Sequence, residues 1–295
     1  MPDRDRLRAF GVRQLYRAGW RIGSWLPRGL VAAIIGRAAR RTLRADGWHV
    51  RNLRRNLALV SGALAGDDLV EAALVSHFRN VYEQLALPGA ADRLVAGVTT
   101  TGEAALRAAH ADRGAVVALP HSGNWDLAGA WACRSGFPVT TVAERLGEAE
   151  FAAFTEFRTR LGMEVFAHGD PAAVAGLVDA VGRGRVVCLL ADRDLARDGV
   201  AVRFAGQPVT MPVGPALIAQ RSGAALFPTV SQFTPEGMVL RIGPEVGVEP
   251  GPDGLAAATQ RVADVFAERI AERPEDWHLL QPFFAEPLTG PEAAR

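Results

Sequence analysis

A short, unbroken apolar run, Ala115–Leu119, ends at Pro120 and is followed at once by His121 and, five positions later, by Asp126. Such runs, closed by turn residues, are typical of strands buried on both faces of a parallel sheet. Asn124 and Ser122 are candidate N-caps for a helix that follows. The pattern predicts a strand-to-helix turn at the carboxyl end of a strand, where open α/β sheets bind their ligands.

The alternation of strand and helix continues along the chain. We expect further strands at 137–143, 162–166, 185–191, 224–230 and 238–242, and helices at 67–87, 102–111, 151–158, 174–181 and 255–271. We expect Pro88 to end the first of these helices, because proline has no N–H to donate. The alternation predicts an α/β fold with a mostly parallel central sheet covered by helices on both faces.

Charge is distributed unevenly between the two ends of the chain. Residues 1–55 hold 14 arginines and three acidic residues, a net charge of +11, whereas residues 56–295 carry a net charge of −10. Within 6–26 the arginines alternate with apolar residues that include two tryptophans, which is typical of a helix lying on an anionic membrane surface. A solvated basic helix packed on its own domain, or a nucleic-acid-binding arm, would share this charge.

We therefore divide the chain into two parts. Residues 1–60 are expected to form a basic, amphipathic membrane-association segment packed on the main domain, and residues 61–290 the α/β domain. The longest apolar run near the N-terminus, 29–35, is shorter than the roughly 20 residues that a spanning helix needs. No secretory signal is predicted either.

Several site classes are disfavoured by the motifs. The two cysteines, Cys133 and Cys188, form no C-x-x-C pattern or Cys/His cluster, which favours a reducing compartment and argues against zinc. The sequence has no G-x-S-x-G elbow, no P-loop and no G-x-G-x-x-G after a strand. A serine hydrolase and a nucleotide-binding site are therefore not expected.

Ionisable residues follow three of the predicted strands: His121 and Asp126, then Glu144-Arg145, then Asp192-Arg193-Asp194. Adjacent parallel strands would place them on one rim of the sheet. A histidine with a pKa near 6.5 can take a proton from an alcohol when a carboxylate orients it. Charged loop tips are also common in any soluble α/β protein, so an incidental histidine at a capped helix remains the alternative.

Other chemistries fit parts of the pattern. The D-x-D of Asp192 and Asp194 after a strand is typical of glycosyltransferases that hold a divalent metal and a sugar diphosphate. A non-catalytic protein that binds membranes through its basic N-terminus is a third possibility. The residue patterns alone leave these alternatives open.

The segment from His121 to Asp126, HSGNWD, resembles the H-x4-D motif of the bacterial lipid A biosynthesis acyltransferases, the family of the lauroyl and myristoyl acyltransferases. The branch that acylates phosphatidylinositol mannosides is the most similar. Further similar segments follow in order at 141–146, 157–165, 192–195, 202–216 and 276–282. The resemblance spans roughly residues 10–285.

The resemblance implies a glycerolipid-acyltransferase-like fold and the transfer of a fatty acyl group, palmitoyl by family habit, from acyl-CoA to a mannose hydroxyl of a phosphatidylinositol mannoside. A related glycolipid, such as one similar to lipid A, is the alternative acceptor. The resemblance further implies a peripheral protein at the cytoplasmic face of the plasma membrane. We expect a monomer that uses acyl-CoA as co-substrate, with no metal, cofactor or nucleic acid.

The resemblance also implies residue roles. His121 is the general base, Asp126 is its orienting carboxylate, and Asp192 is a third catalytic residue at a position where the family carries a glutamate. Substrate contacts are expected from Ser122, Asn124, Trp125, Glu144, Arg158, Arg193 and Asp194. The segment 204–215 is expected to border the acyl groove. On chemical grounds, the backbone N–H groups of the Ser122–Asn124 turn and the Arg193 side chain are candidate donors to the oxyanion of an attacked thioester.

Overall fold

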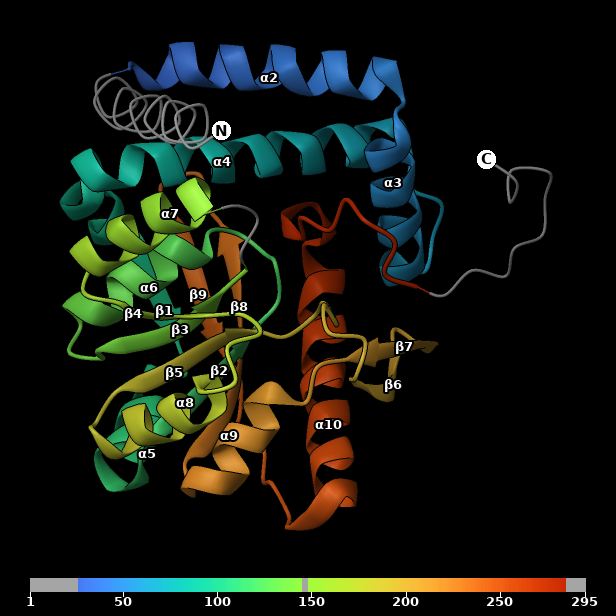
Figure 1. The fold of residues 1–295 in the computed structure, drawn as a ribbon. Helices are drawn as coiled ribbons and strands as arrows, with labels where there is room; N and C mark the ends of the chain where they lie inside the picture. The colour runs from blue at the N-terminus through green and yellow to red at the C-terminus, as the bar shows by residue number, and fades with distance from the viewer. Residues whose placement is uncertain (1–25, 145–147, 285–295) are drawn as a thin grey trace, which may run out of the picture.

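A seven-stranded sheet forms the centre of the computed structural model, which describes residues 26–144 and 148–284 (Figure 1). The strand order is β1-β9-β8-β2-β5-β3-β4, and every pairing is parallel except that of β8 with β9. The strands are β1 Val98–Thr101, β2 Ala115–Leu119, β3 Val139–Ala143, β4 Glu164–Ala167, β5 Val186–Leu190, β8 Ala225–Phe233 and β9 Met238–Ile242. The predicted α/β fold with a mostly parallel sheet is confirmed.

Helices cover both faces of this sheet (Figure 1). They are α2 Arg28–Ala45, α3 Trp48–Ser61, α4 Asp67–Ala96, α5 Glu103–Arg113, α6 Trp125–Arg134, α7 Glu148–Arg160, α8 Ala173–Gly182, α9 Gly214–Ser222 and α10 Gly251–Glu272. A separate antiparallel hairpin, β6 Val200–Phe204 and β7 Gln207–Met211, packs beside α10. Neither the hairpin nor β1 and α9 was predicted from the sequence.

The two faces of the sheet belong to two different apolar cores, because successive side chains of a strand point to opposite sides. On β2, Val116 and Ala118 pack into a cluster with residues of α8, α9 and α10. Val117 and Leu119 of the same strand pack into a second cluster, built with α4, α5 and α6. A third cluster joins α2, α3 and the first half of α4.

Helix α4 continues past Pro88, so the prediction that it ends there is wrong. The helix runs on to Ala96, with a kink at Ala90, whose φ is −131°. Proline removes one helical hydrogen bond and bends the axis. Leu87 and Ala91, on either side of the kink, are buried in the core beneath α6. Tertiary packing therefore compensates for the lost bond, which a local pattern does not show.

The first helices present basic and apolar side chains to the surface. Helix α2 lies along α4 and packs against it (Figure 1). Leu30, Ile34 and Trp48 are exposed, as are the arginines of α2. The basic, tryptophan-rich stretch at 6–25 lies outside the described residues. In the part of the chain that the structure describes, no helix is both long and apolar enough to span a bilayer.

Candidate active site

Two neighbouring strands bring His121 and Asp192 together. Strands β2 and β5 pair in register, with Leu119 opposite Leu190. Beyond them, the N–H of Ala191 donates to the carbonyl of Leu119 at 2.8 Å. His121 and Asp192 each follow two residues after these paired strand ends, and their side chains lie at this rim. The sheet order therefore places an imidazole and a carboxylate side by side, although they are far apart in the chain.

The carboxylate of Asp192 contacts His121 twice. Its Oδ1 lies 2.5 Å from the ring Nδ1, and its Oδ2 accepts the backbone N–H of His121 at 2.9 Å. Oδ2 also accepts the indole N–H of Trp277 at 2.9 Å. The Asp192 side chain is 0% exposed, whereas that of His121 is 17% exposed. The imidazole thus reaches the surface of the site while its partner is completely enclosed.

Hydrogen bonds keep the buried carboxylate ionised. Burial alone would raise the pKa of Asp192, but the neighbouring His121 and the N–H donors of His121 and Trp277 outweigh it and hold that pKa below its usual value. An ionised carboxylate accepts a hydrogen bond from Nδ1–H, which selects the tautomer in which Nε2 carries the lone pair. Nε2 has no hydrogen-bond partner among the described residues. It is therefore the nitrogen that can take a proton.

Asp126 has a different partner from the one that the sequence predicted. It lies in the first turn of α6, where its carboxylate accepts Nε of Arg158 at 2.7 Å and Nη2 at 3.4 Å. Asn124 caps α6, so the helix begins before Asp126 and turns that side chain toward α7. In this structure the carboxylate that orients the His121 ring is Asp192.

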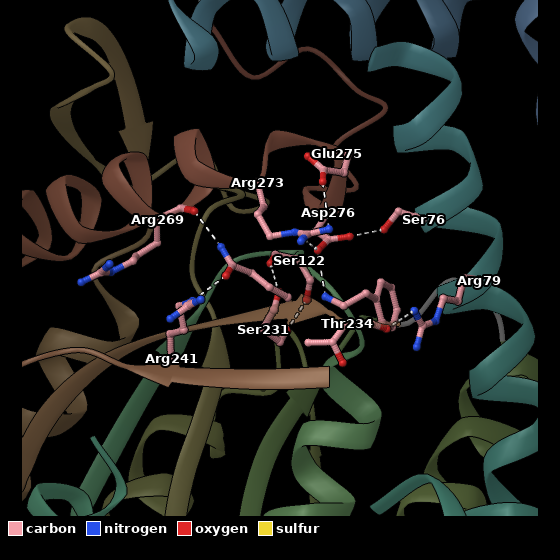
Figure 2. A network of polar contacts seen from close by, with 12 residues as sticks. Ser76, Arg79, Ser122, Ser231, Thr234, Arg241, Arg269, Arg273, Glu275 and Asp276 are labelled. Atoms are coloured by element: carbon pink, nitrogen blue, oxygen red, sulfur yellow. Dashed lines mark hydrogen bonds and ion pairs between the residues drawn. The ribbon is translucent and has the colours of Figure 1, made fainter. Parts of the chain in front are cut away.

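The turn between His121 and α6 is closed tightly. Gly123 has a φ of +55°, and a Cβ at this position would lie 2.7 Å from the carbonyl oxygen of Ser231. The hydroxyl of Ser122 donates to the same carbonyl, and the hydroxyl of Ser231 donates back to the carbonyl of Ser122 (Figure 2). The left-handed backbone and the close approach together require glycine here.

Two of the predicted oxyanion donors are already used. The N–H of Ser122 donates to Pro120 at 2.8 Å, and the N–H of Gly123 donates to the carbonyl of Asp276 at 2.9 Å. The Asn124 side chain is also engaged, because Oδ1 accepts the N–H of Leu127 at 2.9 Å and Nδ2 donates to Glu83 at 3.2 Å. These groups hold the turn in shape, and substrate contacts by Ser122 and Asn124 stay predictions.

The remaining predicted residues lie around the same rim. The ring of Trp125 meets the imidazole of His121 edge-on, with centroids 5.3 Å apart. Glu144 is exposed after β3, while Arg145 lies outside the described residues. Arg193 is half-buried, and Asp194 accepts the N–H of Gly199 at 3.0 Å. Their contacts with substrate stay predictions.

The D-x-D pair has structural partners of its own. Asp192 is bound to His121 and Trp277, and Asp194 holds its own loop through Gly199. Within residues 26–144 and 148–284, no group of three or more His, Cys, Asp or Glu side chains is placed to hold a metal ion. The geometry therefore supports a role for Asp192 beside His121.

An apolar cavity lies between the sheet and α6. Alternate residues of three strands line it, as expected for one face of a sheet. These are Val117 and Leu119 of β2, Val139 and Thr141 of β3, and Val186, Cys188 and Leu190 of β5. The ion pair of Asp126 with Arg158 and the ring of Trp125 line the cavity as well. Since Trp125 also contacts His121, the cavity reaches the neighbourhood of the imidazole.

Sequence reasoning did not assign a role to Trp277. Its indole N–H contacts the carboxylate beside His121, and the segment that carries it, 276–282, was noted only as similar to the family. A buried tryptophan needs a partner for its N–H, but that requirement does not say which acceptor it finds. The contact with Asp192 became visible only in the folded chain.

Comparison with known proteins identifies the class to which this fold and site belong. The chain matches the family model for bacterial lipid A biosynthesis acyltransferases over residues 2–286. It therefore belongs to this family of acyltransferases, which confirms the resemblance seen in the sequence.

Particular relatives are similar over nearly their whole length. The phosphatidylinositol mannoside acyltransferase of Mycolicibacterium smegmatis is 41% identical over 288 residues, which cover 95% of this chain and 93% of that protein. The protein of the same name from Mycobacterium tuberculosis is 40% identical over 294 residues, which cover 95% of this chain and 90% of the relative.

Removal of Arg158, the partner of the buried Asp126, is predicted to destabilise the protein strongly. Asp126 is 2% exposed, so Arg158→Met leaves an uncompensated buried charge and should lower the free energy of unfolding by about 3–5 kcal/mol. Urea denaturation measures this change. Arg160→Met, two residues along α7, removes an exposed pair with Glu156 and should cost less than about 1 kcal/mol. Equal losses in the two variants would contradict the assignment.

Proposed function

We propose that this acyltransferase moves a fatty acyl chain from acyl-CoA to a mannose hydroxyl of a phosphatidylinositol mannoside, with His121 as the general base. The observation that carries the proposal is the imidazole of His121 held by a buried carboxylate beside an apolar cavity. The names of the two mycobacterial relatives support the acceptor. A glycolipid similar to lipid A is the alternative acceptor within the same family.

The chemistry needs one proton transfer in each direction. Nε2 of His121 takes the proton of the sugar hydroxyl while its oxygen forms a bond to the thioester carbonyl carbon. The tetrahedral intermediate then expels the CoA sulfur, which receives the proton from the imidazolium. Asp192 keeps the ring oriented and stabilises its positive charge. General base catalysis of this kind contributes roughly 10²- to 10⁴-fold to the rate.

The oxyanion of the intermediate needs donors other than those that the sequence suggested first. The N–H groups of Ser122 and Gly123 are engaged in the turn. The backbone N–H of Asn124 and the guanidinium of Arg193, which directly follows Asp192 and is half-buried, are the candidates that remain among those predicted. We propose that the Arg193 guanidinium faces the developing negative charge of the intermediate.

The apolar cavity suits an acyl chain. Its walls are mostly aliphatic and aromatic, and the polar groups that line it include the ion pair of Asp126 with Arg158. Each methylene of the chain that enters this space and leaves water contributes about 0.8 kcal/mol. We propose that the chain lies between β5 and α6 with its thioester toward His121.

The acceptor and the protein would meet at a lipid surface. Helices α2 and α3 expose Leu30, Ile34 and Trp48 among several arginines, the combination that binds anionic headgroups. We propose that residues 1–60 dock the protein on the cytoplasmic face of the plasma membrane, as a peripheral monomer.

Loss of the base should abolish turnover. His121→Ala is expected to lower kcat/KM for palmitoyl-CoA and a phosphatidylinositol mannoside by about 10³-fold or more, because the proton acceptor is lost. Asp192→Asn is expected to lower it by about 10²-fold, because the His121 ring is no longer held in the tautomer with a lone pair on Nε2. Release of free CoA measures both. His168→Ala, at an exposed histidine after β4, serves as the control and should retain full activity. Full turnover by His121→Ala would refute the mechanism.

Narrowing the cavity should change chain-length preference. Burial raises the pKa of the Cys188 thiol to about 12, so it is neutral, and Cys188→Leu adds apolar volume without removing a charge. The ratio of kcat/KM for octanoyl-CoA to that for palmitoyl-CoA should rise by about tenfold, because the leucine side chain excludes a few methylenes of the palmitoyl chain from the cavity. Cys133→Leu is the control, because Cys133 is absent from the cavity wall. An unchanged ratio in Cys188→Leu would place the chain elsewhere.

Membrane docking should depend on the exposed apolar residues of α2. The double variant Leu30→Gln and Ile34→Gln should sediment less with vesicles that contain phosphatidylinositol than the unchanged protein does. Leu64→Gln is the control, because Leu64 is the most exposed of the large apolar side chains in the described part of the chain and lies outside α2. Equal sedimentation of the unchanged protein, the double variant and Leu64→Gln would show that α2 is not part of the docking surface.

A further inference from the structure

The C-terminal segment Asp276–His278 is paired with the turn that carries His121. The N–H of His278 donates to the carbonyl of His121 at 2.7 Å, and the N–H of Gly123 donates to the carbonyl of Asp276 at 2.9 Å. Between these bonds, Ser122 and Trp277 face each other in an isolated antiparallel bridge. The backbone on both sides of Trp277 is therefore fixed relative to His121.

The segment is itself anchored to two further elements through the carboxylate of Asp276. That group accepts the hydroxyl of Ser76 from α4 at 2.6 Å and the N–H of Phe233 from the end of β8 at 2.8 Å. Figure 2 shows Asp276 between Ser76 and Arg273, close to the Ser122–Ser231 pair. Helix α4, strand β8 and the His121 turn thus meet at one short segment.

Trp277 is buried among aromatic rings, and its indole N–H donates to a single acceptor, Asp192. The side chain is fully buried, with Phe204 stacked on it at 5.7 Å and Phe283 edge-on at 5.2 Å between ring centroids. Indole has a single donor, and here it reaches Oδ2 of Asp192 at 2.9 Å. Oδ1 is left for Nδ1 of His121. The packed indole and the backbone N–H of His121, which donates to the same oxygen, therefore determine together how the carboxylate is oriented.

We propose that Trp277 is a positioning residue for acyl transfer, which acts by holding the Asp192 carboxylate so that Oδ1 presents itself to His121. The inference rests on the proposed role of His121 as base. A donor on Oδ2 also spreads the negative charge of the carboxylate away from Oδ1. Trp277 therefore limits how strongly Asp192 stabilises the imidazolium, and so sets the basicity of His121 as well as its orientation.

Among the described residues, the indole N–H of Trp277 donates to Asp192 and to no other titratable group near His121. His278 lies on the same C-terminal segment, and burial, with His77 and His121 close by, holds its pKa well below the usual value, so it is neutral. His77 of α4 packs against His278. The Asp126–Arg158 pair of α6 and α7 is already compensated. A change in the titration of His121 therefore reports on Asp192.

The experiment removes the N–H and keeps the ring. In Trp277→Phe, and in a protein with benzothienylalanine at this position, whose sulfur replaces the N–H in the same shape, kcat should fall about tenfold for one lost hydrogen bond. The acidic limb of kcat/KM should move to higher pH by about half a unit to one unit, because the imidazolium is better stabilised. The KM for palmitoyl-CoA should be unchanged.

A matched control separates positioning from packing. Phe283→Leu changes a ring that contacts Trp277 but removes no donor, so it should leave the acidic limb where it is in the unchanged protein. A Trp277→Phe profile that superimposes on the unchanged one, or a limb that moves equally in Phe283→Leu, would overturn the proposal.

A second measurement does not depend on turnover. The His121 imidazole of nitrogen-15 histidine-labelled protein is titrated by NMR in the unchanged protein and in the benzothienylalanine variant. The midpoint for His121 should rise in the variant, and an unmoved midpoint would refute the role of Trp277. If the unchanged protein transfers no acyl group, the proposed function fails while this titration still decides the role of Trp277.

Discussion

A carboxylate sealed from water is the constraint on which the rest of the site depends. An isolated buried charge is costly, and a carboxylate without donors would become protonated. Asp192 remains ionised because three N–H groups surround it: the ring and the backbone of His121, and the indole of Trp277. Each of these groups comes from a segment that must be fixed in place. Three features fix these segments: the strand order of the sheet, the pairing of the C-terminal segment with the His121 turn, and the packing of Phe204 on Trp277.

The two faces of the sheet are packed differently. One face packs against α8, α9 and α10 in a continuous core, which holds the strand ends in register. The other face, beneath α6, leaves an apolar cavity that reaches the site. The same strand β5 contributes to both, since Val187 and Leu189 point one way while Val186, Cys188 and Leu190 point the other. A fixed imidazole and an apolar cavity therefore lie at the same rim of the sheet.

Predictions from the sequence were correct where they depended on neighbouring residues in the chain. They were wrong where contacts with distant segments determine the structure. The run Ala115–Leu119 is β2 with the predicted bounds, and Asn124 caps α6 as expected. Pro88 did not end α4, because buried neighbours support the helix beyond it. The N–H groups of Ser122 and Gly123 were expected to face an oxyanion, but they donate within the protein, and for Gly123 the acceptor lies on the C-terminal segment.

By itself, the sequence determined the α/β alternation, the position of His121 at the end of a strand, and membership of an acyltransferase family, because each of these follows from short-range patterns or from similarity along the chain. Only the tertiary structure decided that Asp192 rather than Asp126 holds His121, and that Trp277 holds Asp192. Spacing within a motif relates residues a few positions apart. Contact between residues 121, 192 and 277 depends on which strands are neighbours in the sheet and on where the chain returns to pair with them, and neither is encoded in any one segment.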